Sequence, residues 1–469
     1  MGRKNLLSLL YALIAIVCNF ISFNSGTSDS ALNTVGYSSV FVLISFLVID
    51  YKINKRFSYA ALFVLILFIF HFGQLMLLTF FSKSYEHIRF IALLDTNVSL
   101  YGFRIMTASL SALCFGALWK SSIFNKINLK GGQYIVDWGK LAKKIIYATF
   151  FVKLGLDLAT LVISFTSGGI AARTFVNSFP NILLFYGKIS LLGFALLLVT
   201  LKFQPKKQLK LFVFIVGYIL IMMVSGIRSE NVGYLAVFLF VYLQSRLKPL
   251  SVKQFVLYGF LGFLGLTFVV AVGQFRNYTD KGLDSFFELT DDLLTEENVL
   301  LGLLDTCGDT GYTAQETLNE YLPKYGPTYG DAYYKGITAV VPNLLPFIID
   351  VGKITAESST PIKLQKSGVL NVSYENIGGS FFAEQYMNFG VIGGVFVCFL
   401  WGLFFGWVGK SSVIAFDTNN MYQLIIMIPI MLASVYWVRS YFGGGIREAV
   451  WDILFAMFIL KRMLRLCRR

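Results

Sequence analysis

Five arginines stand at the ends of long apolar runs, where their side chains could bind a phosphate. The guanidinium group is a planar fork whose donors match a phosphate in a bidentate arrangement, which the point charge of lysine cannot offer. Lysine dominates the other short polar segments of the chain, yet these junctions carry arginine. A phosphate or diphosphate carried by a lipid would suit such a group. Its members are Arg173, Arg228, Arg276, Arg439 and Arg447.

Each arginine also has a structural alternative. A single arginine near a membrane surface commonly extends to lipid head groups or pairs with a carboxylate. Five at a similar depth favour an anion site instead. Arg228 is the sharpest case, because "GIRSENVG" leaves almost no room for a loop between two apolar runs. Glu230 in the same turn either orients Arg228 or caps the helix that follows.

A second group of polar residues lies in "NVSYENIGGSFFAEQYMNFGVIGG". Glu384 could act as a general base toward a hydroxyl group, or it could pair with one of the arginines. Tyr386 and Asn388 follow it closely, and Asp331 in "TYGDAYYKG" is a further acidic candidate. With Glu230, these three are candidates for contacting an acceptor molecule. We expect Glu384, Arg228 and Arg276 to be the catalytic residues.

We expect no metal site and no cofactor. The five cysteines are scattered, with no CxxC pair and no metal-ligand spacing. The chain has two histidines, and His71 falls within an apolar run. A histidine there is expected to be a core residue with satisfied hydrogen bonds.

The composition places these residues in a membrane protein. The chain has 469 residues, of which 56% are hydrophobic and 14% charged, against about 25% charged in soluble domains. Its apolar runs reach the length of a membrane-spanning helix and are too continuous for the strands of a membrane barrel. The net charge of +14 is divided among short segments, which argues against a nucleic-acid partner. The expected fold is an all-α polytopic bundle.

Twelve spans are predicted. The N-terminal "MGRKNLLSLLYALIAIVC" resembles the start of a signal peptide, but no small-residue cleavage site follows, so we expect a retained first span. The spans are 6–23, 33–50, 58–80, 100–119, 143–165, 180–201, 209–226, 231–245, 253–274, 388–408, 420–438 and 445–463.

The positive-inside rule sets the expected topology. With the N-terminus in the cytoplasm, more than half of the 40 lysines and arginines fall on the cytoplasmic side. Both termini are then cytoplasmic, and the five arginines lie on the outer side, where the rule argues against them. The domains are residues 1–274 with nine spans, an extracytoplasmic loop at 275–385, and residues 386–469 with three spans and a basic tail. Apolar stripes in the loop predict amphipathic helices at the interface or in a small soluble cap.

Charges inside the spans give weaker signals. Lys153 and Asp157 are spaced i,i+4 and are expected to pair on one face. Lys188 and Arg104 lack a local partner and are expected to face the bundle interior.

These features together resemble a known family. The chain is similar to the Wzy family of bacterial repeat-unit polymerases of the O-antigen and capsule type. The likeness rests on about twelve spans, a very large late loop, and the local motifs "SGIRSENVGYLAVF", "FRNY" and "GGSFFAEQYMNFGVIGG". The architecture covers most of the chain, whereas the motifs are short and local.

The resemblance implies a fold related to the lipid-linked GT-C glycosyltransferases. It also implies polymerisation of oligosaccharide units carried on undecaprenyl diphosphate, at the outer face of the bacterial cytoplasmic membrane, in lipopolysaccharide or capsule synthesis. No nucleotide sugar is needed, the loop covers a glycan channel, and a flippase and a chain-length regulator are expected partners. The leaving diphosphate would gather negative charge, which fixed arginines could stabilise without a metal.

Four alternatives remain. A lipid-linked oligosaccharide flippase has similar length, but short loops and two similar halves, which this chain lacks. The related O-antigen ligase has an essential histidine in its large loop, and the loop predicted here contains no histidine. A membrane O-acyltransferase also depends on histidine. No sequence feature favours a non-catalytic sensor.

Overall fold

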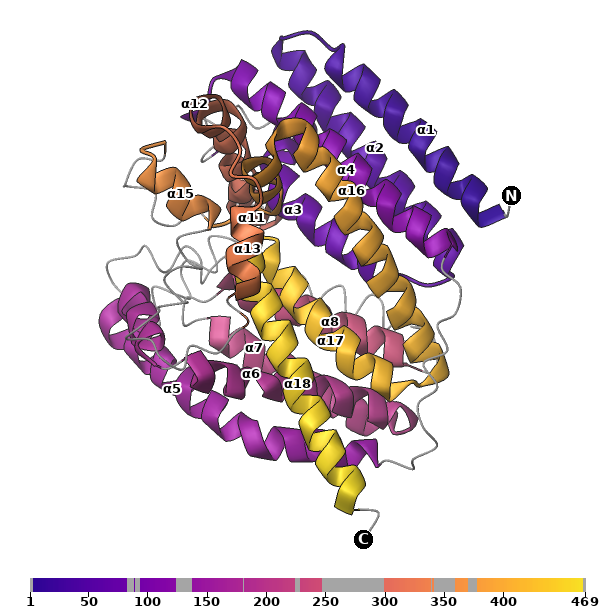
Figure 1. Ribbon diagram of the computed structural model, residues 1–469, viewed down its shortest axis with the longest axis vertical. Coiled ribbons are helices and arrows are strands. Elements are labelled where there is room, and N and C mark those ends of the chain that lie inside the picture. The colour runs from indigo at the N-terminus through magenta and orange to yellow at the C-terminus, as the bar shows by residue number, and fades with distance from the viewer. Residues whose placement is uncertain are drawn as a thin grey trace. The chain divides into compact units, whose positions relative to one another are not determined.

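The computed structural model describes residues 3–81, 88, 93–123, 137–179, 181–223, 228–246, 299–338, 340, 359–369 and 378–466. Within these ranges the chain is helical and contains no β-strand, which confirms the all-α expectation. The helices divide between two compact units (Figure 1). Unit 1 comprises residues 1–128, 304–414 and 433–447, and unit 2 comprises residues 129–303, 415–432 and 448–469.

Every predicted span except 253–274 coincides with a helix, and 253–274 lies outside the described residues. The helices of the first half are α1 Arg3–Phe23, α2 Asp29–Asn54, α3 Tyr59–Phe81, α4 Thr96–Ile123, α5 Trp138–Ser178, α6 Asn181–Thr200, α7 Pro205–Met223 and α8 Arg228–Ser245. The helices of the second half are α11 Val299–Glu316, α12 Leu322–Tyr325, α13 Asp331–Thr338, α15 Thr360–Lys366, α16 Phe381–Thr418, α17 Met421–Trp437 and α18 Phe442–Leu466.

Seven of the described helices are long and apolar enough to cross a bilayer. They are α1 to α4, the first part of α5, the second part of α6, and α16. The apolar helices 231–245 and 421–437 are shorter. The length and composition of the seven long helices make the protein a multi-pass membrane protein.

In unit 1, α1 and α2 pack beside α4 (Figure 1). The amide of Asn19 on α1 donates to the hydroxyl of Ser111 on α4, at 2.9 Å. Helices α4 and α16 approach closely where Gly402 and Gly406 face the backbone of α4. Small residues permit such close packing between helices in a membrane, where hydrophobicity alone does not hold them together.

Helix α11 belongs to the predicted extracytoplasmic loop, yet it packs beside the middle of α3. Glycines make this possible, because a Cβ atom on Gly73 would lie 2.4 Å from the carbonyl oxygen of Leu304. The amide of Gln74 also donates to the carboxylate of Asp309, at 3.1 Å. Gly73 and Gln74 lie roughly 10 Å along the helix axis from the end of α3. The glycine contacts therefore show α11 packed against α3 within unit 1, and the interfacial or capping position stays a prediction.

Two ion pairs join half-buried charges in unit 2. Lys153 and Asp157 on α5 form an ion pair at 2.9 Å, as their spacing predicted, and the hydroxyl of Tyr218 on α7 donates to the same carboxylate. Lys188 on α6 pairs with Glu448 on α18, at 2.7 Å. Such pairing lowers the cost of charge inside a helical bundle.

Candidate functional site

The helix α16 is interrupted at Gly390, and this break shapes the surroundings of Glu384. Gly390 has φ +71° and ψ −176°, so a short helical segment 381–389 precedes the long one. The break releases the carbonyl groups of Met387 and Asn388 from the helix ladder. They accept hydrogen bonds instead from the backbone N–H groups of Thr328, at 2.8 Å, and Gly330, at 3.3 Å.

The short segment begins at a serine cap fixed by His71. The Ser380 hydroxyl accepts from the backbone N–H of Ala383, at 3.2 Å, as an N-cap serine does. Nδ1 of His71 lies 2.9 Å from the carbonyl oxygen of Leu67, and a carbonyl can only accept. Nε2 therefore accepts from the Ser380 hydroxyl, at 2.8 Å. His71 is fully buried and is a core residue with both ring nitrogens bonded, as expected from the sequence.

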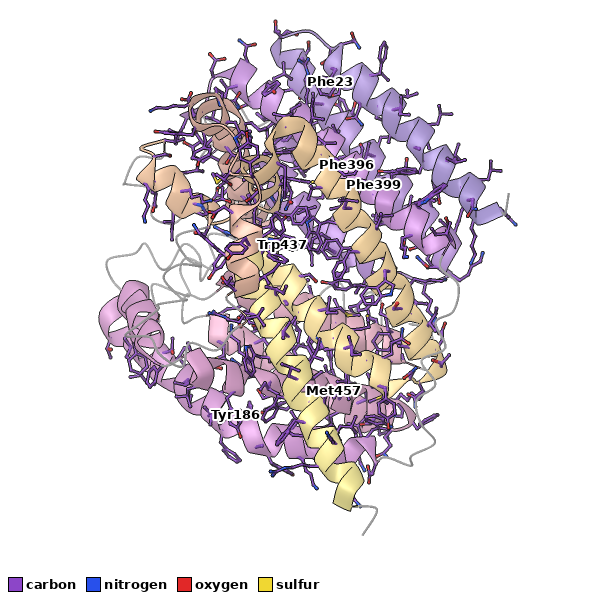
Figure 2. All side chains as sticks on the ribbon, in the orientation of Figure 1. Phe23, Tyr186, Phe396, Phe399, Trp437 and Met457 are labelled. Atoms are coloured by element: carbon purple, nitrogen blue, oxygen red, sulfur yellow. The ribbon has the colours of Figure 1, made fainter. Side chains whose placement is uncertain are left out.

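Glu384 is buried and holds the turn between α17 and α18. Its carboxylate accepts from the indole N–H of Trp437 and from the backbone N–H of Phe442, at 3.1 Å. In the described part of the chain it forms no ion pair with an arginine. Trp437 ends α17 and is labelled in Figure 2. Glu384 thus joins the start of α16 to the turn at residues 438–441.

This turn carries one of the expected arginines, and a second follows on α18. Arg439 is half-buried and forms no ion pair within the described residues. Arg447 is half-buried on the second turn of α18. Gly378 and Gly379 lie against the turn: a Cβ atom on Gly379 would lie 2.1 Å from the carbonyl oxygen of Ser440. These glycines therefore allow close approach of the protein backbone to the arginine turn.

The neighbours of Glu384 connect α16 to other elements. The hydroxyl of Tyr333 on α13 donates to the side chain of Gln385 and accepts from the indole of Trp401, at 3.1 Å. Tyr386 is fully buried, with its hydroxyl 2.7 Å from that of Ser109 on α4.

Asn388, one of the expected acceptor residues, fixes the turn before α13. Its side-chain oxygen accepts from the backbone N–H of Ala332, at 3.0 Å, and from the hydroxyl of Thr328, at 3.2 Å. Its amide donates to the carbonyl of Glu384, at 2.7 Å. Both Tyr386 and Asn388 are buried and use their polar atoms within the protein.

Asp331 lies at the start of α13 and binds two lysines. Its carboxylate is 3.0 Å from Lys335 and 2.8 Å from Lys363 on α15. Partial burial acts to raise the pKa of Asp331, but hydrogen bonds and charge from Lys363 and Lys335 outweigh it, so the pKa lies below its usual value. Asp331 therefore ties α15 to α13.

The other expected residues belong to unit 2 or lie outside the described chain. Arg173 is on α5, and Arg228 and Glu230 are in the first turn of α8, with side chains that are not described. Arg276 lies outside the described residues. Unit 1 brings together Glu384, Tyr386, Asn388 and Asp331, with Arg439 on the turn that Glu384 holds.

Sequence reasoning missed Trp437 and Tyr333. Trp437 is buried and Tyr333 is half-buried, and both are aromatic partners of the 384–388 segment. The position of Trp437 two residues before Arg439 in "YWVRSYF" was the available signal. Tyr333 gave none, since it is one of several tyrosines in its stretch.

An apolar groove runs between α4 and α16 in unit 1. Figure 2 labels Phe396 and Phe399, which line it on α16. The other lining residues are Ile105, Ala112, Phe115, Val391, Ile392 and Val395. Ile392 is 86% exposed, so the groove is open to the surroundings of the bundle. Among the described residues, no cluster of histidine, cysteine or acidic side chains has the arrangement of a metal site.

The fold defines a multi-pass helical membrane protein with an arginine-bearing turn held by a buried glutamate. The chain belongs to the O-antigen polysaccharide polymerase Wzy family, whose model matches residues 6–468. The family implies a polymerase of polysaccharide repeat units. Neither the curated proteins nor the solved structures gave a match.

Proposed function

We propose that this protein joins oligosaccharide repeat units carried on undecaprenyl diphosphate into O-antigen or capsular polysaccharide, at the outer face of the bacterial cytoplasmic membrane. Both termini would then be cytoplasmic. The match of the family over residues 6–468 supports the reaction class. The observation that carries the site is Arg439, a half-buried guanidinium without an ion pair among the described residues. A cation so placed favours binding an anion.

The reaction requires stabilisation of a leaving diphosphate. An acceptor hydroxyl oxygen attacks the anomeric carbon of the donor unit, the bond from that carbon to the diphosphate oxygen breaks, and lipid diphosphate leaves. The hydroxyl proton passes to a base or to water. Arg439 and Arg447, together with Arg173, Arg228 and Arg276, would bind the donor diphosphate and stabilise the charge that develops on it.

Glu384 has two possible roles in this reaction. General-base catalysis requires its carboxylate to reach the acceptor hydroxyl. Its contacts with Trp437 and Phe442 favour a positioning role, in which it holds the turn that carries Arg439. The general-base role stays a prediction that a pH profile can test.

The lipid part of the donor needs an apolar surface. The groove between α4 and α16 is lined only by apolar side chains and is open at Ile392 and Phe396. A polyprenyl chain would lie there with its C–H groups against aromatic rings. The main alternative function is a lipid-linked oligosaccharide flippase, which would move the same lipid without forming a glycosidic bond.

Cells that carry single substitutions test the proposal. Arg228→Ala or Arg439→Ala should abolish polymer and leave single repeat units on the surface lipid, with normal amounts of the protein in the membrane. Arg462→Ala is the matched control, because Arg462 is an exposed arginine near the end of α18. Polymer of normal length and amount in both site variants would overturn the arginine assignment. If a strain that lacks the protein displayed no repeat units at all on its surface lipid, the flippase would be favoured.

A further inference from the structure

Unit 1 carries a strained tyrosine whose side chain is exposed. Tyr329 has φ +50° and is 87% exposed. A bulky residue with positive φ is an outlier and persists only where its surroundings impose it. Gly326 and Gly330 on either side also have positive φ, but glycine accepts that conformation without strain. Tyr329 is therefore the one costly residue of the turn 326–330.

Hydrogen bonds on both sides of Tyr329 impose its conformation. The backbone N–H groups of Thr328 and Gly330 donate to the consecutive carbonyls of Met387 and Asn388. In the described part of the chain the phenol ring makes no hydrogen bond and no ring contact. Folding thus gains little from this side chain. A strained residue that packs against nothing in its own protein suggests a ligand.

Helix α13 begins two residues after Tyr329 and carries two more exposed large side chains. Tyr334 is 72% exposed and Ile337 is 59% exposed, and their i,i+3 spacing places them on one face of α13. Tyr333 is the contrasting neighbour, because its hydroxyl bonds Gln385 inside unit 1. We call Tyr329, Tyr334 and Ile337 the tyrosine ridge.

The ridge lies in a polar setting and carries no charge of its own. Lys335, the charged residue between Tyr334 and Ile337, is paired with Asp331 one turn earlier. Lys324 and Asp331 lie in the same stretch as Tyr329, and such charges are unfavourable in hydrocarbon. These neighbouring charges favour water rather than hydrocarbon around the ridge, and an aromatic ring in water is stabilised when a ligand covers it. A diphosphate would need cations, which the ridge does not present.

A sugar ring is the occupant that fits these properties. Its C–H face is apolar and packs against an aromatic ring, while its hydroxyl groups remain hydrogen-bonded to water or to a phenol. Tyrosine offers both a flat apolar face and a polar tip. The polymer made by this family is a polysaccharide, so the substrate itself supplies such rings.

The geometry points to the tyrosine ridge as a binding site for the saccharide part of a repeat unit, apart from the reacting bond. This inference rests on the proposed function. The ridge is tied through Met387 and Asn388 to the same short helix that bears Glu384, so a saccharide held there would be held by the element that positions the arginine turn.

Binding of soluble saccharides tests the ridge without requiring catalysis. The probe is a set of oligosaccharides of one to four repeat units, released by mild acid from the strain that carries this chain. Affinity for the full-length protein in detergent is measured by calorimetry. Tyr329→Gly removes the ring and relieves the backbone strain, so the variant should fold with an unchanged or higher Tm. Tyr329→Phe keeps the ring.

We expect Tyr329→Gly and Tyr334→Ala each to weaken binding by about tenfold, a typical loss for one aromatic stacking partner. Tyr329→Phe should bind within about twofold of the native protein. Tyr147→Ala, a substitution of an exposed tyrosine on α5, is the matched control and should have no effect. In a polymerisation assay the ridge variants should raise KM more than they lower kcat.

Equal saccharide affinity in Tyr329→Gly, Tyr334→Ala and the native protein would overturn the inference. So would a loss of the same size in Tyr147→Ala. Failure of the ridge as a saccharide site can be distinguished from failure of the proposed polymerase function. A native protein that binds the oligosaccharides through the ridge but joins no lipid-linked units would contradict only the polymerase. Polymerisation with unchanged KM in the ridge variants would contradict only the ridge.

Discussion

The carboxylate of Glu384 lies 3.1 Å from the backbone nitrogen of Phe442. Through this contact, the first turn of α16 sets the position of the first residue of α18 and of the arginine turn before it. The indole of Trp437 donates to the same carboxylate, so both ends of the turn are held by one side chain. Glu384 is 1% exposed, and water does not compete for these bonds.

Replacing Glu384 with glutamine should loosen the arginine turn. The carboxylate accepts from two N–H donors, whereas glutamine has one acceptor oxygen and would turn its NH2 group toward a donor. We expect a loss of about 1–3 kcal/mol in the free energy of unfolding, measured as a lower Tm. Polymerisation should fall equally at every pH. A Glu384→Gln variant with native Tm and a rate that no longer depends on pH would instead assign proton transfer to Glu384.

Arg439→Lys should be far less active than its charge suggests. Lysine keeps the positive charge but loses the planar fork that binds two phosphate oxygens. Losing a charge-assisted hydrogen bond in the transition state typically lowers kcat by about 100-fold. Initial rates with lipid-linked units would measure this loss, with Arg462→Lys as the control. Full activity of Arg439→Lys would show that charge alone suffices at this position.

Gly379→Ala should disrupt the arginine turn by steric overlap. The added Cβ atom would lie 2.1 Å from the carbonyl oxygen of Ser440, and a backbone atom cannot move aside as a flexible side chain does. We expect lower Tm and little polymer. Gly217→Ala on α7 is the matched control, because its Cβ atom would meet nothing within 4 Å, and alanine favours a helix over glycine. Equal Tm in both variants would contradict the close packing.

Asp331 should stabilise the protein at neutral pH and lose this effect in acid. Its pKa is lowered in the folded state, with Lys363 and Lys335 outweighing partial burial. A group with a depressed pKa stabilises the fold above its unfolded pKa of about 4 and loses that contribution as pH falls through the folded value. The difference in Tm between the native protein and Asp331→Asn should be constant from about pH 5 to 8 and vanish in stronger acid. A difference that grows toward acid pH would contradict the ion pairs.

The helices could be predicted from the sequence because each apolar run is long enough to cross a membrane, and few other structures accommodate such runs. The pairing of Lys153 with Asp157 was also predictable, since both partners lie on one helix face. The partner of Lys188 was not, because Glu448 is far away in sequence and meets it only through the packing of α18 on α6.

The surroundings of Glu384 could not be predicted for a related reason. Trp437 and Phe442 are more than 50 residues away, and their bonds with Glu384 depend on how α16, α17 and α18 pack. From the sequence, Glu384 was a candidate to pair with one of the arginines. Its observed partners are neutral N–H donors instead. The contact between α11 and α3 likewise depends on Gly73 and Gly308, which face each other only when both helices are placed.

Reconstitution of the purified protein with undecaprenyl-diphosphate-linked repeat units distinguishes a polymerase from a flippase. We expect polymer without any second protein, with one undecaprenyl diphosphate released for each glycosidic bond formed, and no release from the Arg439→Ala variant. Transfer of the lipid across the bilayer without new glycosidic bonds would contradict this expectation.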